Sequence, residues 1–168
     1  KVKVIEMESE KGAIATVHGA LQAGVLATTY TASQGLLLMI PSIYKMAGEM
    51  LPGVIHVAAR SLSTHSLSIF GDHQDIYAVR QTGACILSSS SVEEAYHMAM
   101  VSHLASIKSS LPFINFFDGF RTSHEIDKVK EIDLSKLETF IDKKGLRKFR
   151  GNGMISGAST RGTAVNED

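Results

Sequence analysis

Glu10 is the acidic residue whose position best suits acid–base chemistry. It follows a β-branched run at residues 2–7, which predicts a strand, and it precedes a small-residue stretch at 12–24, which predicts a helix. A carboxylate at the start of a helix is stabilised by the helix dipole, and this structural role explains the position by itself. The functional alternative is proton transfer, because desolvation beside a nearly uncharged stretch would suit the carboxyl to that task.

Arg60 is the second candidate. It is the only arginine in the first 79 residues, and it directly follows the apolar run at 54–59, which predicts a buried strand. A guanidinium group can bind a carboxylate or a phosphate through two parallel hydrogen bonds. An ordinary internal ion pair is the alternative use of this side chain.

The remaining reactive residue types favour structural roles. Cys85 lies inside a predicted strand, where a small thiol packs as an apolar group. The serine run at 88–91 precedes a predicted helix, and capping of that helix explains it more simply than phosphate binding. The seven histidines show no ligand spacing, so we expect no metal site in this chain.

Strands and helices alternate along the chain, which predicts how these residues are positioned. The predicted strands are residues 2–7, 26–30, 54–59, 84–87 and 113–117, and the predicted helices are 12–24, 36–50, 76–81, 91–110 and 133–150. Strands that are apolar on both faces and separated by helices indicate an α/β fold, with a mostly parallel sheet covered by helices in three layers. Ligands bind such sheets at the carboxyl ends of the strands. We therefore expect five loops to share one edge: 8–11, 31–35, 60–65, 88–91 and 118–121.

Composition narrows the class of protein. The 168 residues are 44% hydrophobic and 20% charged, as in one soluble globular domain. Seventeen basic residues balance seventeen acidic ones without a basic cluster, so we expect no nucleic acid and no anionic membrane as a partner. The longest apolar run, at 36–40, is far shorter than a membrane span. A single cysteine excludes an internal disulfide or a cysteine-rich cluster, and it fits a reducing compartment.

Charge is distributed unevenly, which bears on domain organisation. Between Gly12 and Ala59 only Lys45 and Glu49 are charged, so we expect other domains or a second subunit to cover much of this surface. A wet surface rich in Ser, Thr and Gly is the alternative. The chain starts with Lys1, and we interpret it as a fragment: an α/β domain at 1–150, followed by a Gly/Ser-rich tail at 151–168 that leads to the next domain.

Several runs, in order, resemble the pyruvate:ferredoxin (flavodoxin) oxidoreductase family. They are residues 8–13, 31–41, 51–60, 68–77 and 116–125. The resemblance implies most of the family's N-terminal domain, which binds the aminopyrimidine half of thiamine diphosphate. It also implies that the opening strand, the diphosphate and Mg²⁺ motif and the iron–sulfur ligands are absent from this chain.

The resemblance also implies roles for particular residues. Glu10 corresponds to the catalytic glutamate that hydrogen-bonds the aminopyrimidine and lets the cofactor deprotonate its thiazolium carbon. Arg60 corresponds to the residue that binds the carboxylate of pyruvate. Thr31, Ser33 and Gln34 would line the cofactor pocket.

The implied activity belongs to a larger enzyme. It is the oxidative decarboxylation of pyruvate to acetyl-CoA and CO₂, with electrons passing through iron–sulfur clusters to ferredoxin or flavodoxin. The implied setting is a homodimer in the cytoplasm or in a reduced anaerobic organelle, and the fragment alone would be inactive. Two alternatives stay open: a non-catalytic interaction module of the same fold, and an oxidoreductase for a different 2-oxoacid.

Overall fold

A four-stranded parallel sheet lies at the centre of the computed structural model, which describes residues 2–154. Its strands are β1 (Thr28–Thr31), β2 (Val54–Ala59), β3 (Cys85–Ser89) and β4 (Phe113–Asp118). They are ordered β1-β2-β4-β3, and every neighbouring pair is parallel. Four of the five predicted strands are therefore confirmed, with ends shifted by no more than two residues.

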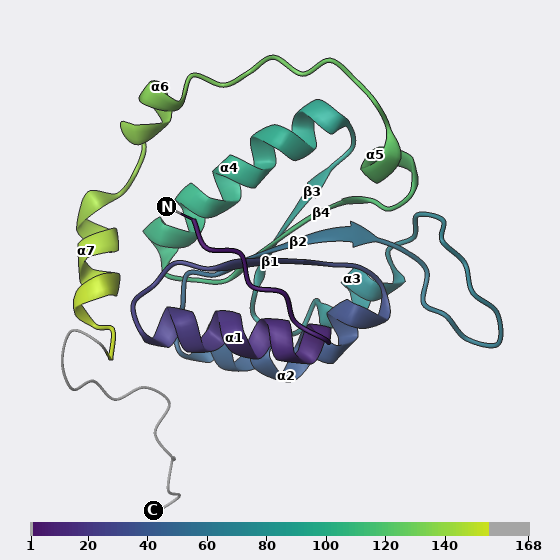
Figure 1. The fold of residues 1–168 in the computed structure, drawn as a ribbon, viewed down its shortest axis with the longest axis horizontal. Helices are drawn as coiled ribbons and strands as arrows, with labels where there is room; N and C mark the ends of the chain where they lie inside the picture. The colour runs from purple at the N-terminus through teal and green to yellow at the C-terminus, as the bar shows by residue number, and fades with distance from the viewer. Residues whose placement is uncertain (1, 155–168) are drawn as a thin grey trace, which may run out of the picture.

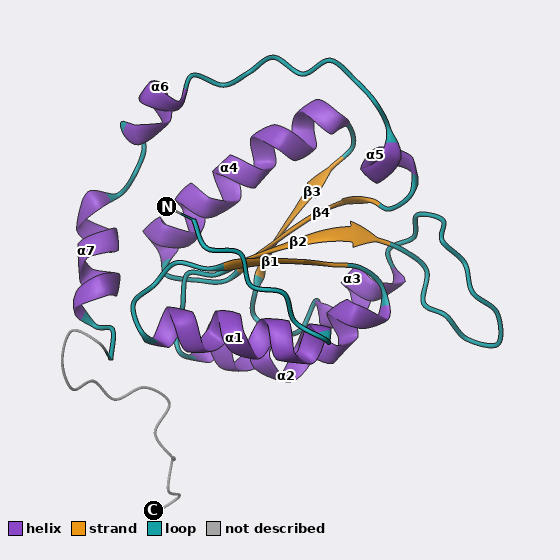
Figure 2. Cartoon of the chain, viewed as in Figure 1, coloured by secondary structure: helices purple, strands orange, loops and turns teal. Residues whose placement is uncertain are grey.

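Helices cover both faces of the sheet, so the three-layer α/β prediction is confirmed. Figures 1 and 2 show α1 (Glu10–Gln22), α2 (Gln34–Gly48) and α3 (Gln74–Val79) on one side of the strands. The long helix α4 (Val92–Ser109) lies on the other side, against β3 and β4. The short helix α5 (Arg121–His124) directly follows β4.

The main core lies between the sheet and the first three helices. Helix α2 contributes Leu36, Met39, Ile43 and Met46, whose spacing of three and four residues forms one apolar stripe. Strand β2 lies between two neighbours and is buried almost throughout, as its continuous apolar sequence predicts. Because these helices pack against the sheet through this core, the residues at which they begin are held in place at the carboxyl edge of the sheet.

The N-terminal segment differs from the prediction. Residues 2–7 form no strand, and the side chains of Val2 and Val4 are 90% and 83% exposed. A strand needs backbone partners, and this segment makes no ladder with the edge strand β1. The β-branched residues favour an extended chain here, but the local sequence alone does not supply a pairing.

The prediction of one helix at 133–150 is also wrong, because the structure has two helices in this region. Helix α6 (Leu134–Glu138) is followed by a break and then by α7 (Lys143–Gly151), which packs against α4. The side chain of Asp142 accepts hydrogen bonds from the N–H groups of Lys144 and Gly145, which starts a new helix there. Most of the predicted tail at 151–168 lies outside the described residues, so the domain division stays a prediction.

The start of α4 confirms its predicted cap. Ser91 Oγ accepts a hydrogen bond from the N–H of Glu94 at 3.2 Å. The Glu94 carboxylate reaches back to the N–H of Ser90 rather than to that of Ser91, so the reciprocal bond is displaced by one residue. No described helix has the length and apolar character that crossing a membrane requires.

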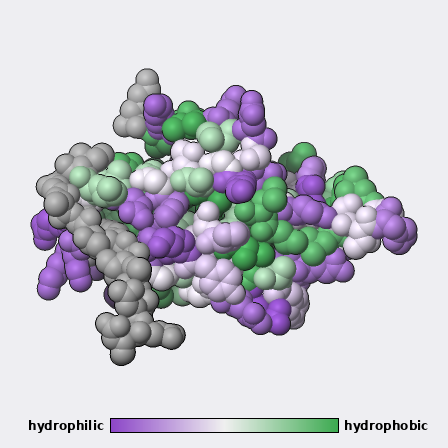
Figure 3. All heavy atoms as spheres, turned by 90° about the horizontal axis from the view of Figure 1, so that it is seen from below, coloured by the Kyte–Doolittle hydropathy of each residue, from purple (hydrophilic) through white to green (hydrophobic). Residues whose placement is uncertain are grey.

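Apolar side chains lie on the surface as well as in the core. Figure 3 looks at the molecule from below the view of Figure 1, and it shows hydrophobic side chains gathered near the middle of this face. Exposed apolar residues of the weakly charged segment include Leu38, Tyr44 and Met50. The low charge of residues 12–59 is thus accompanied by exposed apolar area.

Candidate functional site

The candidate site lies where β1 and β2 end. These strands are neighbours and parallel, so the loops that follow them leave the same edge of the sheet side by side. The loop at 31–35 connects β1 to α2, and Arg60 is the first residue after β2. Glu10 comes to the same place from α1, which packs against α2.

The side chain of Glu10 lies directly over Gly35. A Cβ at position 35 would come within 2.6 Å of Glu10 Cγ and within 2.5 Å of Thr31 Oγ1. Only a glycine leaves room for this approach, because real Cβ atoms do not come so close to a neighbouring atom. The first residue of α1, the end of β1 and the start of α2 therefore meet at one point.

Two polar groups at this point have no partner among the described residues. Thr31 Oγ1 is buried without a hydrogen bond. The Glu10 carboxylate forms no hydrogen bond or ion pair within residues 2–154. A buried hydroxyl without a partner is costly, which favours a ligand atom at Thr31 Oγ1, and the Glu10 carboxylate is also available to a ligand at this edge.

Glu10 also lines a hollow of about 230 Å³, together with Ile5, Met7, Ser9 and Tyr30 among others. Its lining is more polar than apolar, and the carboxylates of Glu8 and Glu10 both belong to it. Glu10 itself is exposed, so the desolvated setting expected from the sequence is not formed by the described residues. A planar polar ring that filled the hollow would itself remove water from Glu10.

Ser33 and Gln34 use their polar atoms to join two loops. Ser33 Oγ donates to the carbonyl oxygen of Ser61 at 2.8 Å, and Gln34 Nε2 donates to that of Ser63 at 2.8 Å. The backbone at Ser33 has φ 49° and ψ −126°, which is a strained conformation for a residue other than glycine. Whether either side chain also touches a cofactor stays a prediction.

Gly119 allows the Arg60 side chain to lie close to the sheet, and Gly71 makes room for the side chain of Asp118. A Cβ at Gly119 would overlap Arg60 Cγ and come within 3.0 Å of Arg60 Nε. Arg60 also forms an isolated antiparallel bridge with Gly71, where a Cβ would overlap the carboxylate of Asp118. Arg60 Nε is buried without a partner, and no carboxylate among residues 2–154 forms an ion pair with Arg60. The internal ion pair, which was the alternative explanation for Arg60, is therefore not formed in this part of the chain.

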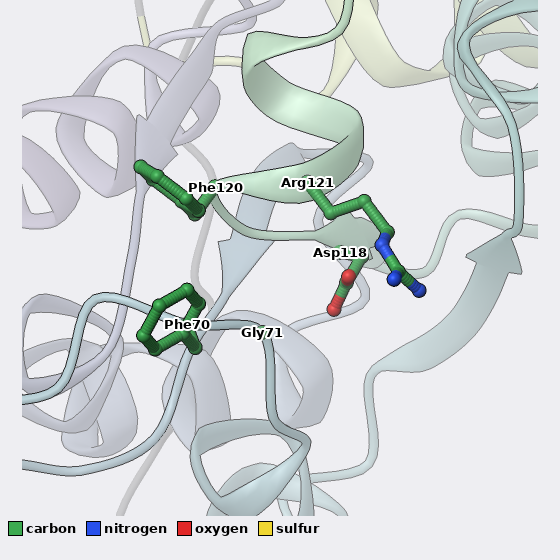
Figure 4. Close-up of a pocket in the computed structure, with 5 residues that line it drawn as sticks. All are labelled: Phe70, Gly71, Asp118, Phe120 and Arg121. Atoms are coloured by element: carbon green, nitrogen blue, oxygen red, sulfur yellow. The ribbon is translucent and has the colours of Figure 1, made fainter.

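A second hollow of about 450 Å³ lies beside the loop that follows β4 (Figure 4), and one of its lining residues, Gly71, is the bridge partner of Arg60. It is lined by Phe70, Gly71, Asp118, Phe120 and Arg121. The rings of Phe70 and Phe120 pack edge to face, with their centroids 5.3 Å apart. Phe120 has a positive φ of 66°, so the turn after β4 holds this ring in place at a backbone cost. The 118–121 loop therefore reaches the site, as the sequence predicts.

Asp75 is the site residue that the sequence did not single out. It is completely buried, and its Oδ2 atom accepts hydrogen bonds from the N–H groups of Ser33 at 2.9 Å and Arg60 at 3.1 Å. Burial raises the pKa of Asp75, and the backbone N–H groups of Arg60, Ser33 and Ile76 oppose that rise. The only signal in the sequence is an acid in the first turn of α3, which is common at helix starts.

The other candidates do not join this group. Ser88–91 lies at the same edge but caps α4, and Cys85 begins β3 as a half-buried free thiol. Among residues 2–154, no group of three or more His, Cys, Asp or Glu side chains is placed to hold a metal ion.

The chain matches one protein-family model along residues 1–168, described as "Pyruvate flavodoxin/ferredoxin oxidoreductase, thiamine diP-bdg". It is 57% identical over 168 residues to a pyruvate-flavodoxin oxidoreductase of Klebsiella pneumoniae, and 55% identical over 168 residues to a pyruvate:ferredoxin oxidoreductase of Moorella thermoacetica. Each match covers 99% of this chain but 14% of the relative. The chain therefore spans about one seventh of the length of these relatives.

A solved structure supports the same fold. A 2-oxoglutarate:ferredoxin oxidoreductase from Magnetococcus marinus, with 2-oxoglutarate, coenzyme A and succinyl-CoA bound, superposes with a TM-score of 0.63. The alignment covers 70% of this chain and 21% of that one at 23% identity, so it bears on the fold alone.

Proposed function

The chain belongs to the pyruvate flavodoxin/ferredoxin oxidoreductase family, in its thiamine-diphosphate-binding domain, and from that premise we propose a role for it in an active site. It supplies the part that binds and activates the aminopyrimidine half of thiamine diphosphate, in an enzyme that oxidatively decarboxylates pyruvate. The observation that carries this proposal is the placement of Glu10 over Gly35, beside the unpartnered Thr31 hydroxyl.

The residues at this point fit an aminopyrimidine ring. Such a ring presents nitrogen atoms that exchange a proton with a carboxyl group, and the Glu10 carboxylate has no competing partner among residues 2–154. The adjoining hollow combines a largely polar lining with the aliphatic side chains of Ile5 and Met7 and the aromatic ring of Tyr30, which suits a flat heterocycle that carries several nitrogen atoms. Thr31 Oγ1 offers a further polar contact at the same place.

Glu10 holds and moves one proton in this scheme. Its carboxyl group shares that proton with a ring nitrogen, and the fixed contact with Gly35 keeps the carboxyl in place while the proton transfers. When bound, thiamine diphosphate supplies the carbon nucleophile and the electron sink that decarboxylation needs. This chain contributes orientation and proton placement.

Arg60 binds the carboxylate of the 2-oxoacid. Its Nε–H is buried and unpartnered, and its backbone is fixed by Asp75 and by the bridge to Gly71. A guanidinium whose hydrogen bonds are not used internally can accept a carboxylate with two parallel N–H···O bonds. Arg60 directly follows β2, and Thr31 is the last residue of the neighbouring strand β1, so substrate and cofactor ring would be neighbours.

The rest of the reaction requires parts outside this chain. The remaining domains of the parent enzyme, which acts as a homodimer, bind the diphosphate, Mg²⁺ and the iron–sulfur clusters. Coenzyme A takes the acetyl group, and ferredoxin or flavodoxin takes the electrons. The names of the two relatives differ in this acceptor, although both are similar to this chain, so the acceptor is selected elsewhere. A reducing compartment, cytoplasmic or organellar, suits these clusters.

The test is an assay of the complete protein with thiamine diphosphate, Mg²⁺ and coenzyme A. Pyruvate should reduce ferredoxin or flavodoxin and release CO₂, and omission of thiamine diphosphate should abolish both. A clear preference for another 2-oxoacid would select the alternative substrate. Absence of any cofactor-dependent turnover would instead favour a non-catalytic interaction module.

A further inference from the structure

Asp75 connects the two loops of the candidate site through one carboxylate oxygen. Its Oδ2 atom accepts from Ser33 N–H, in the loop after β1, and from Arg60 N–H, directly after β2. Its Oδ1 atom accepts from the N–H of Ile76, in its own helix, at 2.8 Å. The side chain of Asp75, which is part of neither segment, therefore sets the distance between the 31–35 loop and Arg60.

The buried carboxylate is explained by these remote donors rather than by helix capping. An acid that only starts a helix works from the surface, whereas the side chain of Asp75 is 0% exposed. No cation forms an ion pair with it in the described part of the chain, so its charge is stabilised by backbone N–H groups. Burial of a carboxylate is costly unless hydrogen bonds satisfy its oxygens, and the N–H groups of Ser33, Arg60 and Ile76 do so here.

The backbone it holds is strained. Ser33 has φ 49° and ψ −126°, and such a conformation persists only where the surroundings enforce it. Two further bonds, from Ser33 Oγ to Ser61 and from Gln34 Nε2 to Ser63, join the same loops farther from the sheet. Without an acceptor at Asp75, Ser33 can relax and the relation of the loop to Arg60 changes.

We propose that Asp75 is a positioning residue, which holds the substrate-binding Arg60 in register with the 31–35 loop that adjoins the cofactor ring. The inference rests on the proposed function, because it concerns the same site. It assigns Asp75 no contact with substrate or cofactor: it acts through the backbone of Ser33 and Arg60. Its removal should therefore affect pyruvate binding and thiamine diphosphate binding together, although it touches neither ligand.

The test uses three variants of the complete enzyme: Asp75→Ala, Asp75→Ser and Asp75→Asn. Alanine removes both acceptors, serine keeps a shorter one, and asparagine keeps an oxygen at the position of Oδ2. Asp72→Asn is the matched control, because Asp72 is exposed in the same segment and, within residues 2–154, its carboxylate accepts a hydrogen bond only from Gln74 N–H. The readouts are the KM for pyruvate per folded active site and the calorimetric Kd of the apoenzyme for thiamine diphosphate with Mg²⁺.

We expect Asp75→Ala to raise both constants by roughly tenfold or more, since a buried N–H without an acceptor is costly. In Asp75→Asn, the KM for pyruvate and the Kd for thiamine diphosphate should lie close to the values of the unaltered enzyme. In Asp75→Ser, both constants should lie between those of the alanine and asparagine variants. When Arg60→Ala is already present, adding Asp75→Ala should hardly change the KM for pyruvate further, whereas it should still raise the Kd for thiamine diphosphate.

A purely structural role would lower the yield of folded enzyme and leave KM and Kd unchanged, and that result would overturn the inference. If the alanine variant fails to fold, equal constants in the serine and asparagine variants would overturn it as well. The proposed function is judged separately, by the activity of the unaltered enzyme and by Arg60→Ala alone.

Discussion

Glu10 occupies the space that a side chain at Gly35 would need. A Cβ there would come within 2.6 Å of Glu10 Cγ and 2.9 Å of its Cδ. The first helix and the start of the second are thus adapted to each other at the carboxyl group that we propose activates the cofactor. A methyl group added at Gly35 tests this relationship without touching Glu10.

Gly35→Ala should displace the Glu10 carboxylate and the nearby Thr31 hydroxyl. We expect a loss of turnover of at least tenfold in the complete enzyme, because proton transfer depends on geometry. Gly48→Ala is the matched control: Gly48 lies in the same helix with no atom near its missing Cβ, and alanine there should stabilise by about 0.5–1 kcal/mol. Equal turnover in the two variants would mean that the position of Glu10 is not critical.

Arg60→Ala should weaken the use of pyruvate by about 1.5–3 kcal/mol in kcat/KM, the usual value of a hydrogen bond to a charged group. Arg60→Lys keeps the charge but loses the planar fork, so it should recover only part of this loss. Steady-state kinetics with pyruvate check both. Unchanged kcat and KM in the alanine variant would mean that Arg60 is structural.

His56 should make the sheet sensitive to acid. It is buried in β2, where Asn115 Nδ2 donates to its Nδ1 at 3.2 Å. Burial, with a smaller contribution from the charge of His103 on α4, lowers the pKa of His56 from 6.5 to about 4. The folded state therefore favours the neutral ring. The resulting contribution to the free energy of unfolding is complete above about pH 6.5 and declines as the pH falls from 6.5 to about 4. The whole loss amounts to up to about 3 kcal/mol.

Hydrogen exchange of the β2 and β4 amides, corrected for intrinsic rates, measures this effect as an opening free energy at each pH. The decline below pH 6.5 should be much smaller in His56→Gln, which cannot become charged. His65→Gln, in an exposed loop, should behave like the unaltered protein. An equal decline in all three proteins would contradict the role of His56.

Local patterns were enough to predict the sheet and the edge where the site lies. Strand β2 and helix α4 follow directly from an apolar run and from Ser91 with Glu94, and Arg60 was found because it ends a buried strand. The strand expected at 2–7 failed because pairing depends on a neighbour that local sequence does not reveal. The helix expected at 133–150 failed because Asp142 can cap a helix as well as continue one.

The contacts within the site were beyond local patterns. Asp75 meets Ser33 and Arg60 across 42 and 15 residues of sequence, and nothing in its own neighbourhood indicates burial. The pairing of Glu10 with Gly35 likewise depends on how α1 packs on α2. Family resemblance predicted the roles of Glu10 and Arg60, and the structure adds the groups that hold them.

The most direct test of the account is Glu10→Gln in the complete enzyme, with Glu6→Gln as the control because Glu6 is an exposed carboxylate of the same segment that does not line the hollow. Glutamine keeps the shape of the side chain but cannot hold the proton. We expect the Kd for thiamine diphosphate to stay within about threefold of the unaltered value, while turnover with pyruvate falls by about 10²- to 10⁴-fold. Glu6→Gln should leave both unchanged. Unaltered turnover in Glu10→Gln would contradict the claim that this carboxylate activates the cofactor.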